Sequence, residues 1–339
     1  MGSSERLPRQ RNGKDDRPPI PEALASKCGH GQDARAVPTG SLGVDREHMI
    51  AGSRGQAGRP AYARLLDVHE KAGPSKKMNT VIFSKDRACQ LDALLRSIDQ
   101  HWTDRKASTE LVIVWTYSNK EYLEGYTKLM VEHPEAKFIC QKDKDFKETA
   151  VAALDPASPL SMFLVDDMLF INPFSLDCPE VERLKNDQEM LCLSLRMHPN
   201  MAYCYMLNIS TPPPEFSNGA WKWKGLQGDW GYVKSLDGHL FRTADIMDAF
   251  KLGQYTQPNA LEEAMLRAIP YRPLASCFSY SKVVNIPSNS VGANATNRRG
   301  NISEKFLNDQ YLAGKKIDVA PFSGMITKSC HMELEYIWK

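Results

Sequence analysis

Short apolar runs alternate with segments of helical periodicity along most of the chain. Four runs are typical of strands: residues 81–83, 111–115, 137–140 and 162–165. Apolar positions spaced three and four residues apart predict helices after the first three runs: residues 90–98, 120–131 and 147–154. Strands that alternate with crossover helices build a parallel sheet covered on both faces. The pattern therefore predicts an α/β fold with a mostly parallel, doubly wound sheet and helices on both faces.

The second half of the chain has a different pattern. Strands are expected at residues 190–195 and 202–207, and helices at residues 243–251 and 259–268. Between them lies a tryptophan-rich segment, residues 221–230, whose rings either pack in the core or form a platform for a sugar or a lipid. No internal repeat is visible after residue 77, so one domain is expected over residues 78–339.

Residues 1–77 follow neither pattern. They hold 10 of the 21 glycines and 7 of the 21 prolines but a single aromatic residue, Tyr62. With 14 Lys+Arg against 9 Asp+Glu, this segment carries a net charge of +5. Such a composition cannot bury enough apolar surface to form a core. Because Met78 stands directly before the first strand-like run, residues 1–77 are expected to be a disordered extension or a wrongly assigned start.

The composition excludes several classes of protein. The apolar runs, such as residues 111–115, are far shorter than the roughly 20 residues that a membrane helix needs, so no transmembrane segment is expected. Residues 78–339 carry a net charge of −3, which disfavours a nucleic-acid partner. The eight cysteines form no C-x-x-C pair, so the usual zinc and redox motifs are absent. Without a secretory signal, the expected location is the cytoplasm, either free or peripheral to a membrane.

Polar residues follow three of the predicted strands. Residues 84–87 (Ser-Lys-Asp-Arg) follow the first strand, Tyr117 the second, and Asp166-Asp167 the fourth. In doubly wound sheets, ligands bind beyond the carboxyl ends of the strands. Adjacent carboxylates repel each other unless a cation neutralises them, and a divalent metal held together with substrate phosphates is one solution. The alternative is a turn or helix-capping aspartate with a solvated neighbour.

Neither common glycine-rich phosphate motif is present. No G-x-x-x-x-G-K-[ST] sequence occurs, and no G-x-G-x-x-G sequence follows a strand. P-loop chemistry and the dinucleotide fingerprint are therefore disfavoured. A phosphate, if bound, would be held through a metal and side chains.

Several segments together carry a resemblance to a known family. They are residues 81–87 with 90–97, residues 163–170 around Asp166-Asp167, and residues 237–242 with 258–263. These segments are similar to the opening strand and helix, the D-x-D-type motif and the acceptor side of GT-A fold glycosyltransferases, close to the family-2-like enzymes. The resemblance spans essentially residues 79–335. It implies a metal-dependent transfer of a sugar from a nucleotide-diphosphate sugar to an acceptor, with inversion.

The resemblance also implies roles for individual residues. Asp167 matches the aspartate that coordinates the metal, Mn²⁺ or Mg²⁺, and His331 is the best placed further ligand near the C-terminus. The sequence departs from D-x-D because Val165 stands at the first acidic place. Contacts to the donor are implied for five residues: Ser84, Asp86, Arg87, Tyr117 and Asp166.

A carboxylate is expected to deprotonate the acceptor hydroxyl. The resemblance favours Glu262 for this base, with Glu263 and Asp229 as further candidates. Glu262 has an alternative explanation, because Asn259 and Glu262 have the spacing of a helix capping box. The sequence leaves these two roles open.

A glycosyltransferase is thus the predicted function, and its acceptor is a glycan, a lipid-linked molecule or a protein. A nucleotidyltransferase on a related fold is the first alternative, but residues 84–87 lack the glycines that its loop after the first strand would need. A catalytically silent module that binds a nucleotide sugar or a glycan is the second alternative. The presence of Asp166, Asp167 and Glu262 disfavours this silent module, whereas Val165 favours it.

Overall fold

The computed structural model describes residues 77–142, 144–291 and 298–339. The expectation of a disordered extension or a wrongly assigned start over residues 1–77 falls, apart from Lys77, outside these ranges. Within the described ranges, no helix combines the length and the apolar character needed to cross a membrane. The seven cysteines described by the structure are all free thiols.

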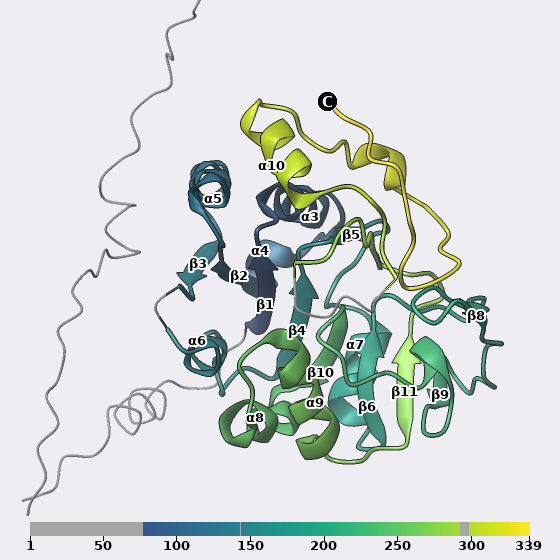
Figure 1. Cartoon of the computed structure of the whole chain (residues 1–339). Coiled ribbons are helices and arrows are strands. Elements are labelled where there is room, and N and C mark those ends of the chain that lie inside the picture. Colours follow the sequence, from purple (N-terminus) through teal and green to yellow (C-terminus); the bar gives the residue numbers. More distant parts are fainter. Residues whose placement is uncertain (1–76, 143, 292–297) are drawn as a thin grey trace, which may run out of the picture. The chain divides into compact units, whose positions relative to one another are not determined.

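The first half of the described chain alternates strands and helices as predicted (Figure 1). The strands are β1 (Met78–Lys85), β2 (Thr109–Thr116), β3 (Lys137–Cys140) and β4 (Leu160–Val165). The helices are α3 (Ala88–His101), α4 (Arg105–Ser108), α5 (Lys120–Glu132) and α6 (Phe146–Ala152). Side chains cap two helix starts: Asn119 accepts a hydrogen bond from Tyr122 N (3.2 Å), and Asp145 accepts one from Lys147 N (2.7 Å).

The strands join an eight-stranded sheet with the order β3-β2-β1-β4-β10-β6-β11-β9. β1 is parallel to β2 and β4, and β2 is parallel to β3. β10 (His239–Arg242) runs antiparallel to both β4 and β6 (Met190–Ser194), and β11 (Leu274–Cys277) is parallel to β6. At the far edge, β9 (Ala220–Lys222) is antiparallel to β11. The expectation of a mostly parallel α/β sheet is confirmed, with two antiparallel strands in its second half.

The structure contradicts the strand predicted at residues 202–207. Only β7 (Tyr203–Cys204) is extended there, and after a turn at residues 205–208 the chain returns as β8 (Ile209–Ser210). Asn208 takes a positive φ of 55° in this turn, a conformation that asparagine tolerates better than most residues. The two helices predicted in this half are confirmed as α8 (Thr243–Leu252) and α9 (Pro258–Ala268).

Helices cover both faces of the sheet, as expected. In Figure 1, α3, α5 and α10 (Glu304–Leu312) lie on one side of the row of strands, and α6, α8 and α9 lie on the other side. β5 (Met168–Phe170) pairs with β12 (Val283–Asn285) beside α3. The remaining elements are α7 (Pro179–Asn186) and the 3-10 helices η1 (Gly228–Trp230) and η2 (Ala320–Phe322).

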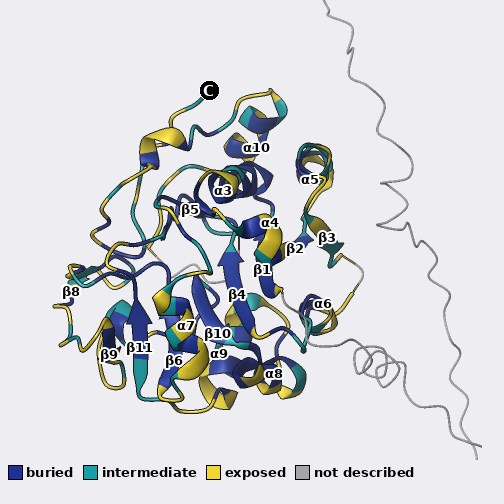
Figure 2. Cartoon of the chain, turned by 180° about the vertical axis from the view of Figure 1, so that it is seen from behind, coloured by how far each residue is buried: buried dark blue, intermediate teal, exposed yellow. Residues whose placement is uncertain are grey.

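The core lies between the sheet and these helices. Figure 2 shows the central strands buried and the outer faces of the helices exposed. Phe83, Phe163 and Phe250 pack between β1, β4 and α8, and the ring centroids of Phe163 and Phe250 lie 5.2 Å apart. A fully buried side chain of this size stabilises the fold by about 1.5–3 kcal/mol. The first four strands are therefore fixed firmly enough to hold polar groups at their ends.

Two of the three tryptophans considered for a sugar platform belong to this core. Trp221 is 1% exposed and Trp230 2% exposed, and their ring centroids lie 5.2 Å apart. The platform hypothesis is therefore wrong for these two residues. Trp223 is partly exposed, and its indole N–H donates to the carbonyl of Arg272 (2.7 Å).

Candidate active site

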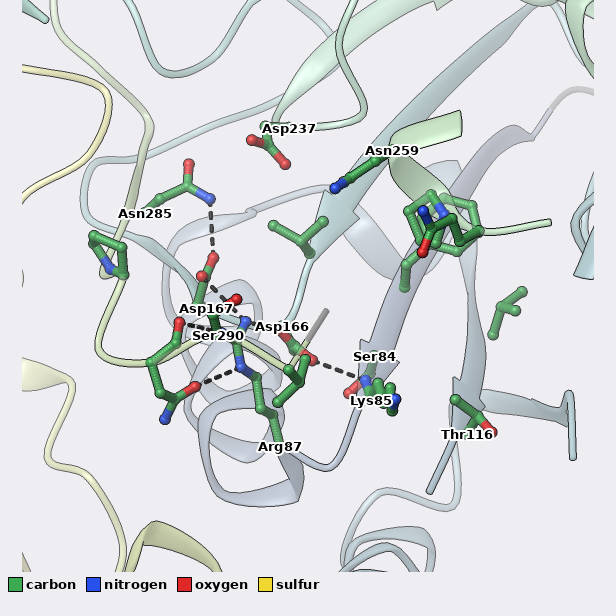
Figure 3. Close-up of a pocket in the computed structure, with 18 of the residues that line it drawn as sticks. Ser84, Lys85, Arg87, Thr116, Asp166, Asp167, Asp237, Asn259, Asn285 and Ser290 are labelled. Carbon is green, nitrogen blue, oxygen red and sulfur yellow. Dashed lines mark hydrogen bonds and ion pairs between the residues drawn. The ribbon is translucent and has the colours of Figure 1, made fainter. Parts of the chain in front are cut away.

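A cleft of about 620 Å³ opens at the carboxyl ends of β1, β2 and β4 (Figure 3). Because β10 is antiparallel to β4, its N-terminal end lies at the same edge of the sheet. Six of the residues predicted from the sequence line this cleft: Ser84, Arg87, Tyr117, Asp166, Asp167 and His331. The other predicted residues lie outside its lining: Asp86, Asp229, Glu262 and Glu263.

Asp166 is the buried member of the carboxylate pair that follows β4. It is 3% exposed and accepts hydrogen bonds from Arg87 Nη1 (2.9 Å) and from the backbone N–H of Lys85 (3.1 Å). Burial raises the pKa of Asp166 to about 6, and the Asp167 charge adds to this shift while Arg87 opposes it. The position of Asp166 is therefore set from the end of β1.

Asp167 is more open toward the cleft. Its Oδ2 lies 3.3 Å from Arg87 Nη1, and its Oδ1 accepts a hydrogen bond from Asn285 Nδ2 (2.9 Å). The backbone carbonyl of Asp167 also accepts from Ile286 N (2.7 Å), which joins the end of β4 to the chain after β12. Asp167 is thus held by two elements and still presents its carboxylate to the cleft.

Arg87 is the cation between the two aspartates. Its Nε donates to Asn289 Oδ1 (2.7 Å) and its Nη2 to the carbonyl of Asn289 (2.6 Å). Burial alone would lower the pKa of Arg87, but Asp166 and Asp167 outweigh burial and raise it. The guanidinium therefore neutralises the aspartate pair and ties it to the segment that carries Asn289.

The backbone between β1 and α3 brings Arg87 into this place. Asp86 has a φ of +57°, a left-handed conformation that costs a non-glycine residue roughly 1–2 kcal/mol. Its carboxylate accepts hydrogen bonds from Ser118 N (2.7 Å) and Ser118 Oγ (2.6 Å), which compensate for this strain. Ser84 Oγ lies 2.6 Å from the hydroxyl of Tyr126. In this structure, Asp86 and Ser84 support the loop with their side chains.

Tyr117 lines the cleft at the end of β2. The Tyr117 ring stacks on Trp115, with centroids 5.7 Å apart, and Lys142 Nζ lies 4.6 Å from the Tyr117 ring centre. Lys85 and Arg299 also line the cleft. Neither of them forms a side-chain ion pair with any residue in the described part of the chain.

The opposite side of the cleft holds Asp237, for which the sequence predicted no individual role. In Figure 3 the carboxylates of Asp237 and Asp167 face the same space. Asp237 Oδ2 lies 3.4 Å from Arg196 Nη1, and the Asp237 side chain is 24% exposed. Burial raises the pKa of Asp237, and the charges of Asp167 and Asp229 add to this shift while Arg196 opposes it.

Gly238 allows Asp237 to reach the cleft. It has a φ of +62°, and a Cβ at this position would lie 2.8 Å from Met168 Cε and 3.1 Å from Arg196 Cγ. Its carbonyl accepts from Leu195 N (2.9 Å), which joins the start of β10 to the end of β6. The strand-end pattern predicts no role for Asp237, because this residue precedes its strand, whereas ligands of a parallel sheet bind at residues that follow the strands.

His331 enters the cleft beside Asn285. A backbone bridge pairs the two residues, and Asn285 N donates to the carbonyl of Cys330 (3.0 Å). His331 Nε2 lies 3.9 Å from Asp237 Oδ2, and its buried Nδ1 has no hydrogen-bond partner among the described residues. Burial lowers the pKa of His331, and the Arg196 charge lowers it further, so the imidazole is neutral.

Glu262 lies behind Asp237 and not in the cleft. Its Oε1 accepts from Leu236 N (2.8 Å) and its Oε2 from the hydroxyl of Tyr232 (2.9 Å). Burial raises the pKa of Glu262 to about 7, and Asp237 contributes to this shift. The capping-box alternative is wrong. The N-cap of α9 is Gln257, two residues before Asn259, and Pro258 follows it in the first turn.

The two other candidates for the acceptor base lie apart from the cleft. Glu263 is exposed on α9 and forms an ion pair with Arg267 (3.1 Å). Asp229 lies in η1, and its buried Oδ2 has no hydrogen-bond partner in the part of the chain that the structure describes. Burial raises the pKa of Asp229, whereas Arg196 lowers it.

Among the buried ion pairs at the cleft, the carboxylates outnumber the arginines. Asp166, Asp167 and Asp237 are compensated by two arginines, Arg87 and Arg196. Carboxylate oxygens suit Mn²⁺ and Mg²⁺, and a neutral imidazole is a less favoured but tolerated ligand of Mn²⁺. The residues predicted to hold a metal, Asp167 and His331, thus fit such an ion by their chemistry.

Comparison with known proteins supports one functional class. No protein-family model matches the chain. The bifunctional glycosyltransferase pgtA of Dictyostelium discoideum is 28% identical over 189 residues, which are 49% of this chain and 24% of that protein. The chain therefore matches about a quarter of the length of this relative. The resemblance to a glycosyltransferase that the sequence segments predicted is confirmed.

Three solved structures are similar at a lower level. TarS 1–349 of S. aureus in complex with UDP-GlcNAc is 15% identical with a TM-score of 0.41, over 60% of this chain and 56% of that one. Mannosyltransferase PcManGT of Pyrobaculum calidifontis, in complex with GDP-Man and Mn²⁺, is 11% identical with a TM-score of 0.36, over 69% and 65%. GalNAc-T7 with UDP, GalNAc and Mn²⁺ is 11% identical with a TM-score of 0.37, over 60% and 44%. These TM-scores are below 0.5, so no ligand or residue role is transferred from these proteins.

Proposed function

We propose that this chain is a glycosyltransferase that moves a sugar from a nucleotide-diphosphate sugar to a hydroxyl group of an acceptor, with a divalent metal and with inversion. The observation that carries the proposal is the arrangement of Asp167, Asp237 and His331 around one cleft at the carboxyl edge of the sheet. The sequence match to a glycosyltransferase over 189 residues supports it.

The donor would lie along the β1–β2 side of the cleft. The ring of Tyr117 offers a stacking surface for the nucleoside, and Thr116 and Gln141 line the same part. Lys85 and Arg299 are available for the diphosphate, because no described carboxylate pairs with either side chain. Arg87 serves the donor indirectly, since its guanidinium holds Asp166 and Asp167 in place.

Asp167 and His331 would hold the metal. The partial exposure of Asp167 and the unpartnered Nδ1 of His331 leave donor atoms for it. When bound, the metal supplies positive charge that stabilises the departing diphosphate. Asp166 is too deeply enclosed by Arg87 and Lys85 N to be the first choice of ligand, and its carboxylate instead fixes the end of β1.

Asp237 would accept the proton of the acceptor hydroxyl. It is the carboxylate on the side of the cleft opposite the aspartate pair, and its raised pKa suits a general base. Glu262 contributes by fixing the backbone N–H of Leu236, directly before Asp237. A base on one face of the sugar and a leaving group on the other give a single displacement, which inverts the anomeric carbon.

A thermal-shift screen with nucleotide-diphosphate sugars tests the proposal. Purified protein is heated with uridine, guanosine, adenosine and thymidine diphosphate sugars, each with Mn²⁺, with Mg²⁺ and with EDTA. Stabilisation by the sugars of one base, lost with EDTA, is expected because only the folded state binds the donor. Release of the nucleoside diphosphate from that donor, slow with water and faster with an acceptor, then measures transfer.

The matched control for the screen is Asp248→Asn, a change at a carboxylate of α8 outside the cleft. The variant should respond to donor and metal as the wild type does. No stabilisation of the wild type by any donor would refute the proposed function. Stabilisation without any release of nucleoside diphosphate would favour the silent binding module, and release of pyrophosphate from a nucleoside triphosphate would favour a nucleotidyltransferase.

A further inference from the structure

Arg196 is a buried cation that touches both sides of the cleft without lining it. It follows β6, and its side chain is 3% exposed. Nη1 donates to Asp237 Oδ2 (3.4 Å) and to Asn285 Oδ1 (3.2 Å), and Nη2 donates to Ser235 Oγ (3.3 Å). The same guanidinium nitrogen, Nη1, therefore contacts both Asp237 and Asn285.

Asn285 extends this contact to the other side of the cleft. Its Nδ2 donates to Asp167 Oδ1 (2.9 Å), while its Oδ1 accepts from Arg196. The chain of hydrogen bonds thus runs from Asp237 through Arg196 and Asn285 to Asp167. These two carboxylates have opposite roles in the proposed function, one toward the acceptor and one toward the metal and donor.

A second buried arginine shows what a purely structural arginine looks like in this fold. Arg242 Nε donates to Asp245 Oδ2 (2.9 Å), and its guanidinium also donates to the carbonyls of Leu184, Asp187 and Met190. All of its donor groups thus face well-placed acceptors. Arg242 holds α7, β6 and α8 together at the end of the sheet remote from the cleft.

Arg196 is much less well satisfied than Arg242. Its hydrogen bonds of 3.2–3.4 Å are long, and its buried Nε has no partner among the described residues. Burying an incompletely paired charge costs several kcal/mol of folding free energy. A contribution to stability therefore does not by itself explain why an arginine is buried at position 196. A buried polar atom without a partner calls for an explanation, and catalytic hydrogen bonds are often long when no ligand is bound.

We propose that Arg196 is a positioning residue that holds Asp237 and, through Asn285, Asp167 at a fixed separation across the cleft. The inference rests on the proposed function and adds to it a residue that contacts neither donor nor acceptor. Loss of Arg196 should affect both carboxylates at once, whereas loss of Asn285 should affect Asp167 alone.

The first test compares Arg196→Met with Arg242→Met in the full chain. Hydrolysis of the donor found in the thermal-shift screen gives kcat and KM, and the melting temperature reports stability. Arg196→Met should lower kcat about 100-fold, because a shift of about 1 Å in a catalytic group has this effect. The donor KM should change by less than about threefold, since Tyr117 and Lys85 are untouched. Arg242→Met should lower the melting temperature and leave kcat unchanged.

Arg196→Lys keeps the charge but replaces the planar fork by a single ammonium group. This variant should fold, and its kcat should fall by about 10-fold, because one ammonium group cannot hold Asp237 and Asn285 in the same plane. If Arg196→Met does not fold, the kcat of Arg196→Lys is the measurement that tests the positioning role. A kcat for Arg196→Lys within about twofold of the wild type would overturn the inference.

The second test needs no activity. Binding of Mn²⁺ alone is measured from the electron paramagnetic resonance signal of the free ion. Asn285→Ala, which removes no charge, and Arg196→Lys, which keeps the charge but not the planar fork, should each weaken Mn²⁺ binding by about 10-fold. The double variant should be no weaker than the weaker single variant, because both changes act on one chain of contacts. Unchanged Mn²⁺ binding in both single variants would contradict the link to Asp167.

The two hypotheses fail in different ways. A wild-type protein that neither hydrolyses nor transfers any nucleotide sugar would refute the proposed function, and the Mn²⁺ titrations would still decide the role of Arg196. An active wild type whose folded Arg196 variants match it in kcat and in Mn²⁺ affinity would refute only the positioning role.

Discussion

Two groups of buried carboxylates in this chain have opposite electrostatic surroundings. Asp92, on α3, is completely buried and meets Arg96 (2.8 Å), His133 (3.0 Å) and Lys316 (3.5 Å). Burial alone would raise the pKa of Asp92, but the hydrogen bonds from His133 and Arg96 outweigh it and lower the pKa. In the cleft the balance is reversed, since burial and neighbouring carboxylates raise the pKa of Asp166 and Asp237.

This difference separates a closed structural cluster from the open cluster of the proposed active site. The ligand atoms of Asp92, Glu132 and His133 lie within 4.8 Å of one another, a spacing that would suit a metal. However, Lys316 Nζ already lies 3.0 Å from Glu132 Oε2 and close to Asp92, so the negative charge is neutralised by the protein itself. In the cleft, three carboxylates form ion pairs with only two buried arginines, and the further cations that line the cleft, such as Lys85 and Arg299, form no ion pair with them among the described residues. A donor set with the right spacing is therefore less informative than carboxylates whose pKa values are raised in a cleft.

The largest effect is expected where the open group loses a carboxylate. Asp167→Asn should lower the rate of sugar transfer about 1,000-fold, because it removes the charge that faces the metal and the diphosphate. The fold should remain, since the amide can still accept from Asn285 Nδ2 and repulsion with Asp166 is relieved. Nucleoside diphosphate release and the melting temperature, measured on the same sample, check both parts. Full activity in Asp167→Asn would remove the distinction between the two groups.

The closed group should respond in the opposite manner. Asp92→Asn leaves Arg96 and Lys316 without their shared carboxylate, so the free energy of unfolding should fall by about 3 kcal/mol. Sugar transfer per folded molecule should be unchanged, and stabilisation by Mn²⁺ should persist. Urea unfolding followed by circular dichroism measures the loss. A variant with normal stability and impaired transfer would mean that Asp92 belongs to a functional site.

The sequence predicted the first half of the fold well because β1, β2 and β4 are apolar on both faces and are followed by amphipathic helices. It also predicted the aspartate pair, since a polar residue after a buried strand is visible in one dimension. Arg196 could have been found by the same rule, because it follows the predicted strand at residues 190–195. His331 was predicted through the resemblance alone. It pairs with Asn285 by an isolated backbone bridge, which produces no periodic pattern of apolar residues in the sequence.

Other parts of the site depend on contacts that a linear pattern does not contain. Asp237 precedes β10, and only the antiparallel direction of that strand brings it to the cleft. The roles of Arg87 and Glu262 depend on which groups their side chains contact in the folded chain. Arg87 donates hydrogen bonds to Asp166 and Asp167, which are 79 and 80 positions away in the sequence. Glu262 accepts one from Leu236 N, 26 positions away. Charge compensation is set by such distant pairs, so the sequence shows which groups are charged and the fold decides which of them are neutralised.

The smallest effect concerns the pH dependence of stability, where the two groups act in opposite directions. The pKa of Asp166 in the cleft is raised from 3.8 to about 6, and that of Glu262, which lies behind Asp237 and interacts with its charge, is raised from 4.5 to about 7. Between the unfolded and the folded pKa of each group, the folded state binds more protons than the unfolded state, so the stability of the fold should increase as the pH falls. Asp92 has a lowered pKa, so its contribution is present above its unfolded pKa of 3.8 and is lost as the pH falls through the folded value.

The melting temperature, measured in EDTA, should therefore rise as the pH is lowered from about 8 to about 5 and should fall again below about 4. Glu262→Gln should flatten the rise, because the amide does not titrate. Glu263→Gln, at the exposed neighbour that pairs with Arg267, should leave the profile unchanged. Asp92→Asn should reduce the fall below about pH 4, because the variant no longer has a carboxylate to protonate there. A melting temperature that increases steadily from about pH 5 to about pH 8 would show that the cleft carboxylates are compensated as fully as Asp92, and that the contrast between the two groups is not real.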